Sequence, residues 1–231
     1  MTLETKCWER DWEIVCKTEH LRTLAARNCY PFAARVLLIN NVSDYGTVCH
    51  WAQRAVANGS LTECVVVEEQ APQALESLGL TREALGAGYV YSSAELVGIH
   101  RCRTEFLLHF AGDAIPAAPC EWIPAALALF AQDSRVKVAN LAWGEGAVEA
   151  RAEASEEMPD WYLGPGFSDQ CYLVRAADFR APIYSESHPD SQRYPRYAGE
   201  LFEKRLDAWL RNHDYLRATY KHGHYRHWRP P

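Results

Sequence analysis

A short apolar run that ends in a turn of small residues constrains the fold of this chain more than any other feature. Continuous runs of this kind, four to five residues long and rich in residues that favour strands, are typical of strands buried on both faces of a sheet. Ligands of an open α/β sheet lie beyond the carboxyl ends of its strands, so polar residues placed there are candidates for a site. Three runs share this form: Arg35–Ile39 before Asn40, Cys64–Val67 before Glu68, and Phe106–Phe110 before Ala111, Gly112 and Asp113.

Helical patterns alternate with these runs over the first 140 residues, and this alternation predicts an α/β fold. We expect a Rossmann-like, mostly parallel sheet with helices on both faces. The second half departs from the alternation and is expected to cover the strand ends, with residues 144–157 as an ordered loop or hairpin. The patterns predict helices at 8–28, 47–58, 71–77, 92–103, 122–132 and 197–212, and further strands at 88–91, 136–142 and 171–174.

Composition narrows the class of protein. The chain has 231 residues, 48% of them hydrophobic, which suits one domain with a sizeable core. Its net charge of −6 argues against a nucleic-acid partner. It has no apolar run of the roughly 20 residues that a membrane span needs, and no signal-peptide core, so we expect a cytoplasmic protein. The eight cysteines form no C-x-x-C pair, which predicts free thiols.

Several common nucleotide and hydrolase motifs are missing from the sequence. Gly144-Glu-Gly146 lacks the third glycine of a dinucleotide-binding loop. The chain contains neither the G-x-x-x-x-G-K-[ST] phosphate loop nor the G-x-S-x-G nucleophile elbow. The polar strand ends therefore remain as the strongest functional signal.

Three segments together resemble a GT-A glycosyltransferase of the family-2-like type. Residues 97–113 resemble the helix and strand that lead to a D-x-D-like turn. Residues 164–175 resemble the glycine and aromatic segment before a late strand, and residues 197–205 resemble the acidic helix start that supplies a catalytic base. The likeness covers about residues 34–228. It implies one catalytic domain over residues 1–231, with a nucleotide-sugar half at 34–140 and an acceptor half at 141–231 that ends in a basic, histidine-containing tail.

The resemblance implies a divalent metal, Mn²⁺ or Mg²⁺, at the D-x-D-like turn. Asp113 would be a ligand, but Ala111 stands where the family has its first carboxylate. A single carboxylate is a weak site for such an ion, which prefers several oxygen ligands. His222 and His224 in the tail are the candidates to complete it.

The resemblance also implies a nucleotide-diphosphate sugar as donor, with a UDP-sugar favoured. Asn40 and Glu68 would bind its nucleoside. Arginine binds phosphates in a bidentate manner, which favours the basic group before the fourth strand as the diphosphate site. That group is His100, Arg101 and Arg103, and a second basic cluster, Arg217, Lys221, Arg226 and Arg229, would close over the donor as a lid.

Inverting transfer to a hydroxyl acceptor needs a carboxylate as general base. The candidates are Asp169, Glu200 and Glu203, and Glu200 is favoured because it follows Gly199. Trp161, Tyr162, Phe167 and Trp209 would wall the sugar and acceptor sites or lie in the core. The leading hypothesis is therefore a metal-assisted glycosyltransferase. A sugar nucleotidyltransferase and a non-catalytic module that binds nucleotide-sugars or glycans are the alternatives.

Overall fold

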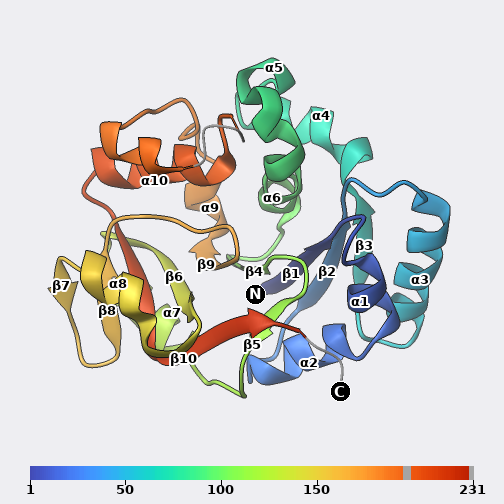
Figure 1. Cartoon of the computed structure of the whole chain (residues 1–231), viewed down its shortest axis with the longest axis horizontal. Helices are drawn as coiled ribbons and strands as arrows, with labels where there is room; N and C mark the ends of the chain where they lie inside the picture. Colours follow the sequence, from blue (N-terminus) through green and yellow to red (C-terminus); the bar gives the residue numbers. More distant parts are fainter. Residues whose placement is uncertain (195–198, 229–231) are drawn as a thin grey trace.

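The computed structural model describes residues 1–194 and 199–228, which form one mixed sheet with helices on both faces (Figure 1). Neighbouring strands follow the order β3-β2-β1-β4-β9-β6-β10-β8-β7, and β5 pairs with β10. The block β3-β2-β1-β4 is parallel, whereas β9 runs antiparallel to both β4 and β6. The strands are β1 (Thr2–Cys7), β2 (Ala34–Ile39), β3 (Glu63–Val66), β4 (Phe106–Phe110), β5 (Ala114–Pro116), β6 (Val136–Trp143), β7 (Glu156–Glu157), β8 (Trp161–Gly164), β9 (Cys171–Arg175) and β10 (Leu216–His227).

Two layers of helices cover the sheet, and Figure 1 shows α4, α6 and α10 at the top of the view with α2 and α7 at the bottom. Side chains alternate between the two faces of a strand. Leu37 and Leu108 therefore pack with α1, α2, α3 and α7, while Leu38 and Leu107 pack with α4, α6, α9 and α10. The helices are α1 (Trp12–Lys17), α2 (His20–Arg27), α3 (Tyr45–Ala57), α4 (Val67–Ser77), α5 (Arg82–Leu85), α6 (Tyr89–Arg101), α7 (Ile123–Gln132), α8 (Val148–Glu153), α9 (Ala176–Phe179) and α10 (Phe202–Asn212), with the 3₁₀ turns η1 (Gly86–Gly88), η2 (Glu145–Ala147) and η3 (Pro189–Arg193).

The predicted α/β sheet with helices on both faces is confirmed. The three apolar runs form β2, β3 and β4, and the strands expected at 136–142 and 171–174 are β6 and β9. Asp44 caps α3, since its side chain accepts a hydrogen bond from the Thr47 amide at 2.9 Å. The helix expected at 197–212 begins at Phe202, and the part of that expectation on residues 197 and 198 lies outside the described residues. The eight cysteines are free thiols, as expected.

The N-terminal prediction is wrong in two respects. Residues 2–7 form β1, which pairs with both β2 and β4 near the centre of the sheet. The helix expected at 8–28 is two helices, α1 and α2, separated at Thr18 and Glu19. Residues 2–7 mix polar with apolar side chains, which is not the pattern of a strand buried on both faces. The structure nevertheless buries side chains of both kinds. Glu4 is among the buried polar residues, and His109 of β4 forms a hydrogen bond with its carboxyl at 2.9 Å.

The strand expected at residues 88–91 is also wrong, because α6 begins at Tyr89. Residues 92 and 93, where the predicted helix begins, lie buried inside α6. Ser92 accepts a hydrogen bond from the Phe202 amide at 2.9 Å, which joins α6 to the start of α10. Tertiary contacts thus override the local strand preference of this segment. The loop or hairpin expected at 144–157 contains η2, α8 and β7.

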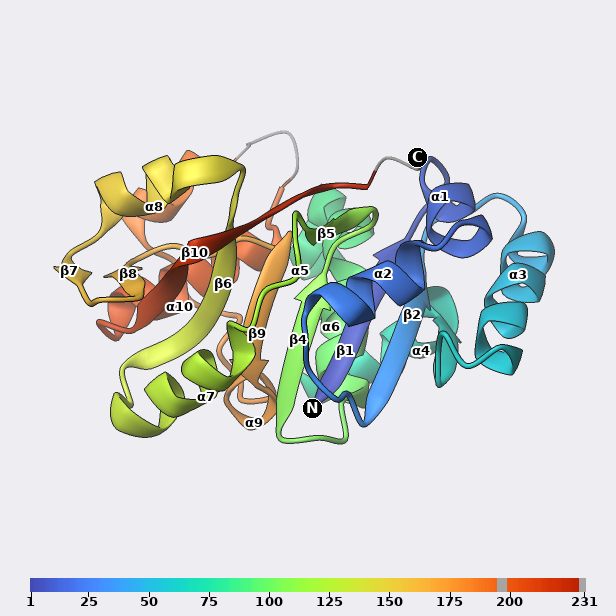
Figure 2. The same ribbon diagram turned by 90° about the horizontal axis from the view of Figure 1, so that it is seen from below.

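The basic tail forms β10, a strand inside the sheet between β6 and β8. Its pairing with β6 moves from Tyr220 opposite Leu141 directly to His224 opposite Ala142, so residues 221–223 bulge out of the ladder. Gly223 lies in this bulge, where an added Cβ would come within 2.6 Å of the Cys120 sulfur. Beyond the bulge β10 pairs with β5, and Figure 2 shows it running from β6 across to β5.

Candidate functional site

Loops at the carboxyl ends of β1, β2 and β4 surround a cleft of about 560 Å³, which we call the strand-end cleft. The parallel block of the sheet creates this position, since its strands all end at the same edge. Segments from the late part of the chain complete the wall. The lining residues are Lys6, Trp8, Glu9, Asp11, Asn40, Asn41, Val90, Tyr91, Ala111, Gly112, Asp113, Asp169, Gln170 and His227.

Asp113 lies at the turn after β4, and a histidine of β10 reaches it. His227 Nδ1 and Asp113 Oδ1 are 2.6 Å apart, and the Trp228 amide donates to the Asp113 carbonyl at 2.7 Å. The prediction had paired Asp113 with His222 and His224. The bulge in β10 changes which residues reach the turn: His222 forms a hydrogen bond with Asp160 instead, at 3.0 Å, and His224 pairs with Ala142 of β6. The histidine beside Asp113 is therefore His227, which the prediction missed.

Asp113 supplies a carboxylate oxygen, the type of ligand that suits Mn²⁺ and Mg²⁺, and His227 supplies an imidazole nitrogen beside it. Over residues 1–194 and 199–228, no three His, Cys, Asp or Glu side chains are grouped to hold a metal ion. The pair thus fits an ion that takes its remaining ligands from a bound diphosphate and water. Asp11 stands close by, within reach of Gly112, and its pKa is raised to about 7 by burial and further by the charge of Asp113.

The loop before β9 brings two of the predicted catalytic carboxylates together. The Asp169 amide donates to Glu203 Oε1 at 2.8 Å, and Glu203 lies in the first turn of α10. Burial, followed by the nearby charge of Asp169, raises the pKa of Glu203 well above its usual value. A carboxylate with a raised pKa accepts a proton more readily than an ordinary one, which suits a general base.

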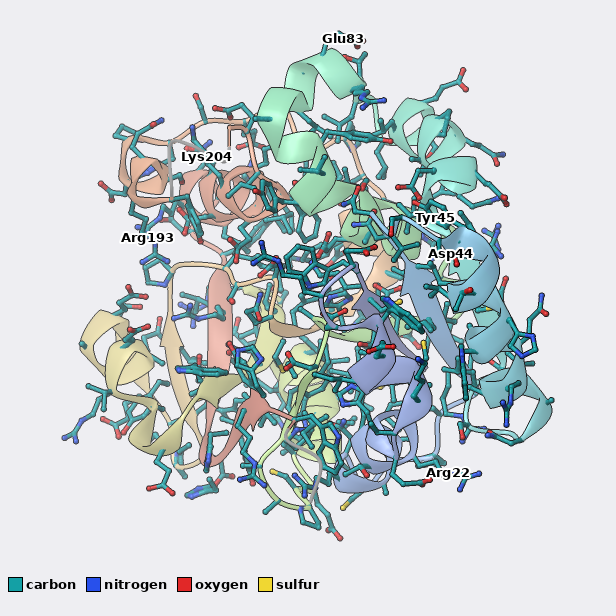
Figure 3. The ribbon with its side chains drawn as sticks, turned by 45° about the vertical axis from the view of Figure 1, so that its right-hand side comes forward. Arg22, Asp44, Tyr45, Glu83, Arg193 and Lys204 are labelled. Carbon is teal, nitrogen blue, oxygen red and sulfur yellow. The ribbon has the colours of Figure 1, made fainter. Side chains whose placement is uncertain are left out.

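Glu200, the favoured base, has a different environment. It is exposed, and its carboxylate pairs with Lys204 at 2.7 Å, one turn along α10. Figure 3 shows Lys204 on the α10 side of the molecule, well away from Asp44 and Tyr45 at the start of α3. Glu200 also lines neither of the two large clefts in the described part of the chain. Glu203 and Asp169 are therefore the better placed carboxylates.

A second cleft, of about 530 Å³, lies between the ends of β6 and β10 and helix α8, and we call it the α8 cleft. Glu203 lines this cleft, whereas Asp169 lines the strand-end cleft, so the Asp169–Glu203 contact joins the two. Its remaining polar and aromatic lining includes Asn140, Trp143, Glu145, Glu149, Glu153, Phe167, Ser168, Arg193, Tyr194, Arg217, Thr219 and Tyr225.

An ion pair between β1 and α6 lies next to Asp169. Lys6 of β1 makes a short ion pair with Glu95 of α6 and lies 3.6 Å from the Asp169 carboxylate. Burial alone would lower the pKa of Lys6, but the charges of Glu95 and Asp169 raise it above its ordinary value. Glu95 and His109 are fully buried, with His109 Nε2 4.0 Å from Glu95 Oε1. Lys6 thus connects the polar interior of the sheet to the wall between the clefts.

The two residues expected to bind a nucleoside both lie at the strand ends. Asn40 follows β2 and is buried in the strand-end cleft, where its side-chain oxygen accepts a hydrogen bond from Ser93 at 3.4 Å. Glu68 is in the first turn of α4 and does not line that cleft. Its carboxylate accepts from the Asn41 amide at 3.3 Å, which places Glu68 just behind the rim.

The three basic residues expected to bind diphosphate lie at the wrong edge of the sheet. A helix between parallel strands runs back against them, so the end of α6 lies at the amino end of β4, opposite Asp113. His100 forms a hydrogen bond with Ser77 at 2.7 Å, and Arg101 pairs with Glu63, the first residue of β3. Arg103 follows α6 at the same edge. The prediction is corrected: these residues are remote from the strand-end cleft.

The second basic cluster is a structural part of the sheet rather than a lid. Arg217 is buried at the start of β10 and pairs with Glu153 at 3.3 Å, and Lys221 pairs with Glu157 at 2.6 Å. Arg226 lies opposite Ile115 of β5, while Arg229 lies outside the described residues. Among the predicted aromatic walls, Phe167 lines the α8 cleft, whereas Trp161 and Trp209 are buried in the core.

Sequence reasoning missed the whole contribution of β1 to the site. Lys6, Trp8, Glu9 and Asp11 all line the strand-end cleft, and they come from the end of β1 and the loop after it. The signal that could have found them is the acidic and aromatic segment after residue 7, at a position equivalent to Asn40 after β2. Trp143 was missed as well, although it directly follows a predicted strand.

The fold is similar to that of several glycosyltransferases of known structure. Glucosyl-3-phosphoglycerate synthase from Mycobacterium tuberculosis, solved with Mn²⁺, UDP and glucosyl-3-phosphoglycerate, matches with a TM-score of 0.54 at 14% identity, over 100% of this chain and 73% of its own. A mycobacterial protein matches with a TM-score of 0.53 at 16% identity, over 100% and 68%. Staphylococcus aureus TarS with UDP matches with a TM-score of 0.51 at 12% identity, over 97% of this chain and 59% of its own.

These likenesses confirm the predicted fold: the chain has a GT-A-like glycosyltransferase fold. The synthase has also been solved with Mg²⁺ and UDP, so structural neighbours bind UDP together with a divalent metal. No protein-family model matches the chain, and no curated protein matches its sequence. Among the described residues, none of the helices has the length and apolar character needed to cross a membrane.

Proposed function

We propose that this protein is a glycosyltransferase that moves a sugar from a nucleotide-diphosphate donor of the UDP-sugar type to a hydroxyl group of an acceptor. The observation that carries the proposal is the contact of His227 with Asp113 at 2.6 Å, at the carboxyl end of β4 and in the strand-end cleft. The fold and the metal- and UDP-bound state of its structural neighbours support the same assignment.

The charge of the strand-end cleft supports a metal-assisted reaction. Its described lining includes four carboxylates, those of Glu9, Asp11, Asp113 and Asp169, against the cations Lys6 and, when protonated, His227. A diphosphate would be repelled by this surface unless a further cation lay between them. A Mn²⁺ or Mg²⁺ ion held by Asp113 and His227 would supply that charge and stabilise the leaving diphosphate.

The residues of the chain itself then have distinct tasks. In the strand-end cleft, Asn40 holds the nucleoside of the donor, and Glu68 of α4 fixes the adjacent Asn41 backbone from behind the rim. Glu203 accepts the proton of the acceptor hydroxyl, whose oxygen bonds to the anomeric carbon as the bond from that carbon to the diphosphate breaks. Asp169 orients Glu203 through the backbone contact at 2.8 Å. A single displacement of this kind inverts the anomeric configuration.

The test is release of nucleoside diphosphate from a panel of UDP-, GDP-, ADP- and dTDP-sugars, with Mn²⁺, Mg²⁺ or EDTA. Asp113→Asn should lower release with the active donor by about 10²-fold or more. Asp160→Asn is the matched control, because Asp160 forms the same kind of pair with another histidine of β10 but lines neither cleft. Equal loss in both variants would contradict the proposal.

Two further measurements on the same protein separate the alternatives. A non-catalytic module would be stabilised against heat by a nucleotide-sugar without releasing the diphosphate. A sugar nucleotidyltransferase would form pyrophosphate from a nucleoside triphosphate and a sugar phosphate. Either result in place of diphosphate release would replace the glycosyltransferase assignment.

A further inference from the structure

Trp143 is an exposed aromatic side chain of the α8 cleft, beside one residue of the proposed metal site. It is the last residue of β6, lines the α8 cleft and is 57% exposed, which is unusual for a tryptophan in a strand. The indole packs edge-on against Tyr225 and His227, with ring centroids 5.3 and 4.8 Å apart. Since His227 also contacts Asp113, this exposed indole adjoins the place where the donor sugar would be transferred.

The arginines of the α8 cleft are already paired with carboxylates. Arg193 contacts Glu153 at 2.6 Å and Asp207 at 3.8 Å, and Arg217 contacts the other oxygen of Glu153 at 3.3 Å. Glu145 and Glu149 are exposed on the same wall, and within residues 1–194 and 199–228 neither forms an ion pair. The cleft is therefore acidic where it is open, and an anionic acceptor would be repelled from it.

We propose that the α8 cleft binds a neutral saccharide as the acceptor, with one pyranose ring stacked on Trp143. This assignment rests on the proposed function. The C–H face of a pyranose is apolar and packs on an indole ring, while its hydroxyl groups donate hydrogen bonds to carboxylates. Trp143 supplies the flat surface, Glu145 and Glu149 supply the acceptors, and Glu203 lies on the same wall to receive the proton of the reacting hydroxyl.

The test measures binding of simple probes to the full chain in the presence of UDP and Mg²⁺. Saturation-transfer NMR compares neutral methyl glycosides of glucose, galactose, mannose and N-acetylglucosamine with 3-phosphoglycerate. At least one glycoside should bind, 3-phosphoglycerate should bind more weakly, and Trp143→Ala should weaken the glycoside about tenfold. Trp51→Ala is the matched control, because Trp51 of α3 is a partly exposed tryptophan that lines neither the α8 cleft nor the strand-end cleft.

The inference is overturned if no glycoside binds, if 3-phosphoglycerate binds more tightly, or if Trp143→Ala leaves glycoside binding unchanged. It is also overturned if Trp51→Ala weakens the glycoside as much as Trp143→Ala does. Thermal stabilisation by UDP with Mg²⁺, measured in the same samples, reports on the donor separately. Normal stabilisation without saccharide binding would defeat this inference alone, whereas saccharide binding without nucleotide stabilisation would defeat the donor assignment.

Discussion

The strand-end cleft and the α8 cleft have nearly equal volumes, about 560 and 530 Å³, but they are built in different ways. The first is formed mostly by loops that follow parallel strands, where backbone geometry fixes each polar residue. The second is formed by a bulged strand, short helices and ion pairs that span long sequence separations, such as Arg217 with Glu153. The position of the strand-end cleft therefore follows from the topology of the sheet, whereas that of the α8 cleft depends on contacts between particular side chains.

The largest expected effect lies on the wall that the two clefts share. Glu203→Gln should lower turnover by about 10²–10⁴-fold, because a general base contributes that much. The amide can still accept the hydrogen bond from the Asp169 backbone, so stabilisation by UDP with Mn²⁺ should persist. Steady-state rates with the active donor and thermal shifts measure the two quantities.

Glu200→Gln is the control for Glu203→Gln, since Glu200 is the same residue type just before the same helix but is exposed and pairs with Lys204. It should keep turnover near that of the unmodified protein. Loss of turnover in Glu200→Gln, with Glu203→Gln unaffected, would return the base to the residue that the sequence favoured.

A smaller loss, about 10²-fold or more, is expected from Asp113→Asn in the strand-end cleft, by comparison with removal of one preorganised electrostatic group. This variant differs from Glu203→Gln in a second property: added Mn²⁺ should no longer increase the thermal stabilisation given by UDP. If Mn²⁺ still increases it, Asp113 does not hold the ion. Saccharide binding in the α8 cleft should be unchanged.

Lys6→Met tests the Lys6–Glu95 ion pair, which lies next to Asp169 on the wall that the two clefts share. Removing one partner of a buried ion pair leaves Glu95 without its cation, and we expect a loss of about 3 kcal/mol in the free energy of unfolding. Lys137→Met is the control, because Lys137 is equally exposed, at 18%, but its partner Asp178 is at 30% exposure whereas Glu95 is at 0%. The control should lose at most about 1 kcal/mol. Urea denaturation measures both, and equal losses would refute the special role of the Lys6–Glu95 pair.

The smallest effect concerns pH. The folded-state pKa of Glu203 is raised above the usual value of 4.5, so the folded protein holds this proton more tightly than the unfolded chain. Stability from this group is therefore present at low pH and falls as the pH rises from about 4.5 toward the folded pKa. Glu203→Gln should flatten that fall, because the variant has no titrating proton at this position. Denaturation at pH 5 and pH 8 measures it, and identical slopes would contradict it.

The sequence predicted the strand-end cleft better than the α8 cleft, and the difference has a physical cause. Asn40 and Asp113 follow apolar strands, and the edge at which such strands end follows from the fold class alone. His227 could not be identified in this way, because the bulge at residues 221–223 determines which histidine reaches the turn. The packing of Gly223 against Cys120 and Leu141 positions that bulge, and such a contact has no local signature.

The missed strand β1 illustrates a second limit. Glu4 and Lys6 are charged residues on a strand that is buried, and charge in a short segment normally argues against burial. Their partners, His109 and Glu95, come from β4 and α6, about a hundred residues away. Compensation over such a separation is visible only in the folded chain. It also explains why the nucleotide-sugar half predicted at residues 34–140 omits part of the strand-end cleft.

The position of β10 makes the integrity of the sheet depend on a late segment. This strand fills the space between β6 and β8, and it also carries His227 to Asp113. Proteolytic removal of residues beyond Tyr215 would expose unpaired edges on β5, β6 and β8, and such edges promote aggregation. A cleaved molecule would therefore be lost as an insoluble species, rather than persist as a fragment that binds nucleotide but cannot complete the site.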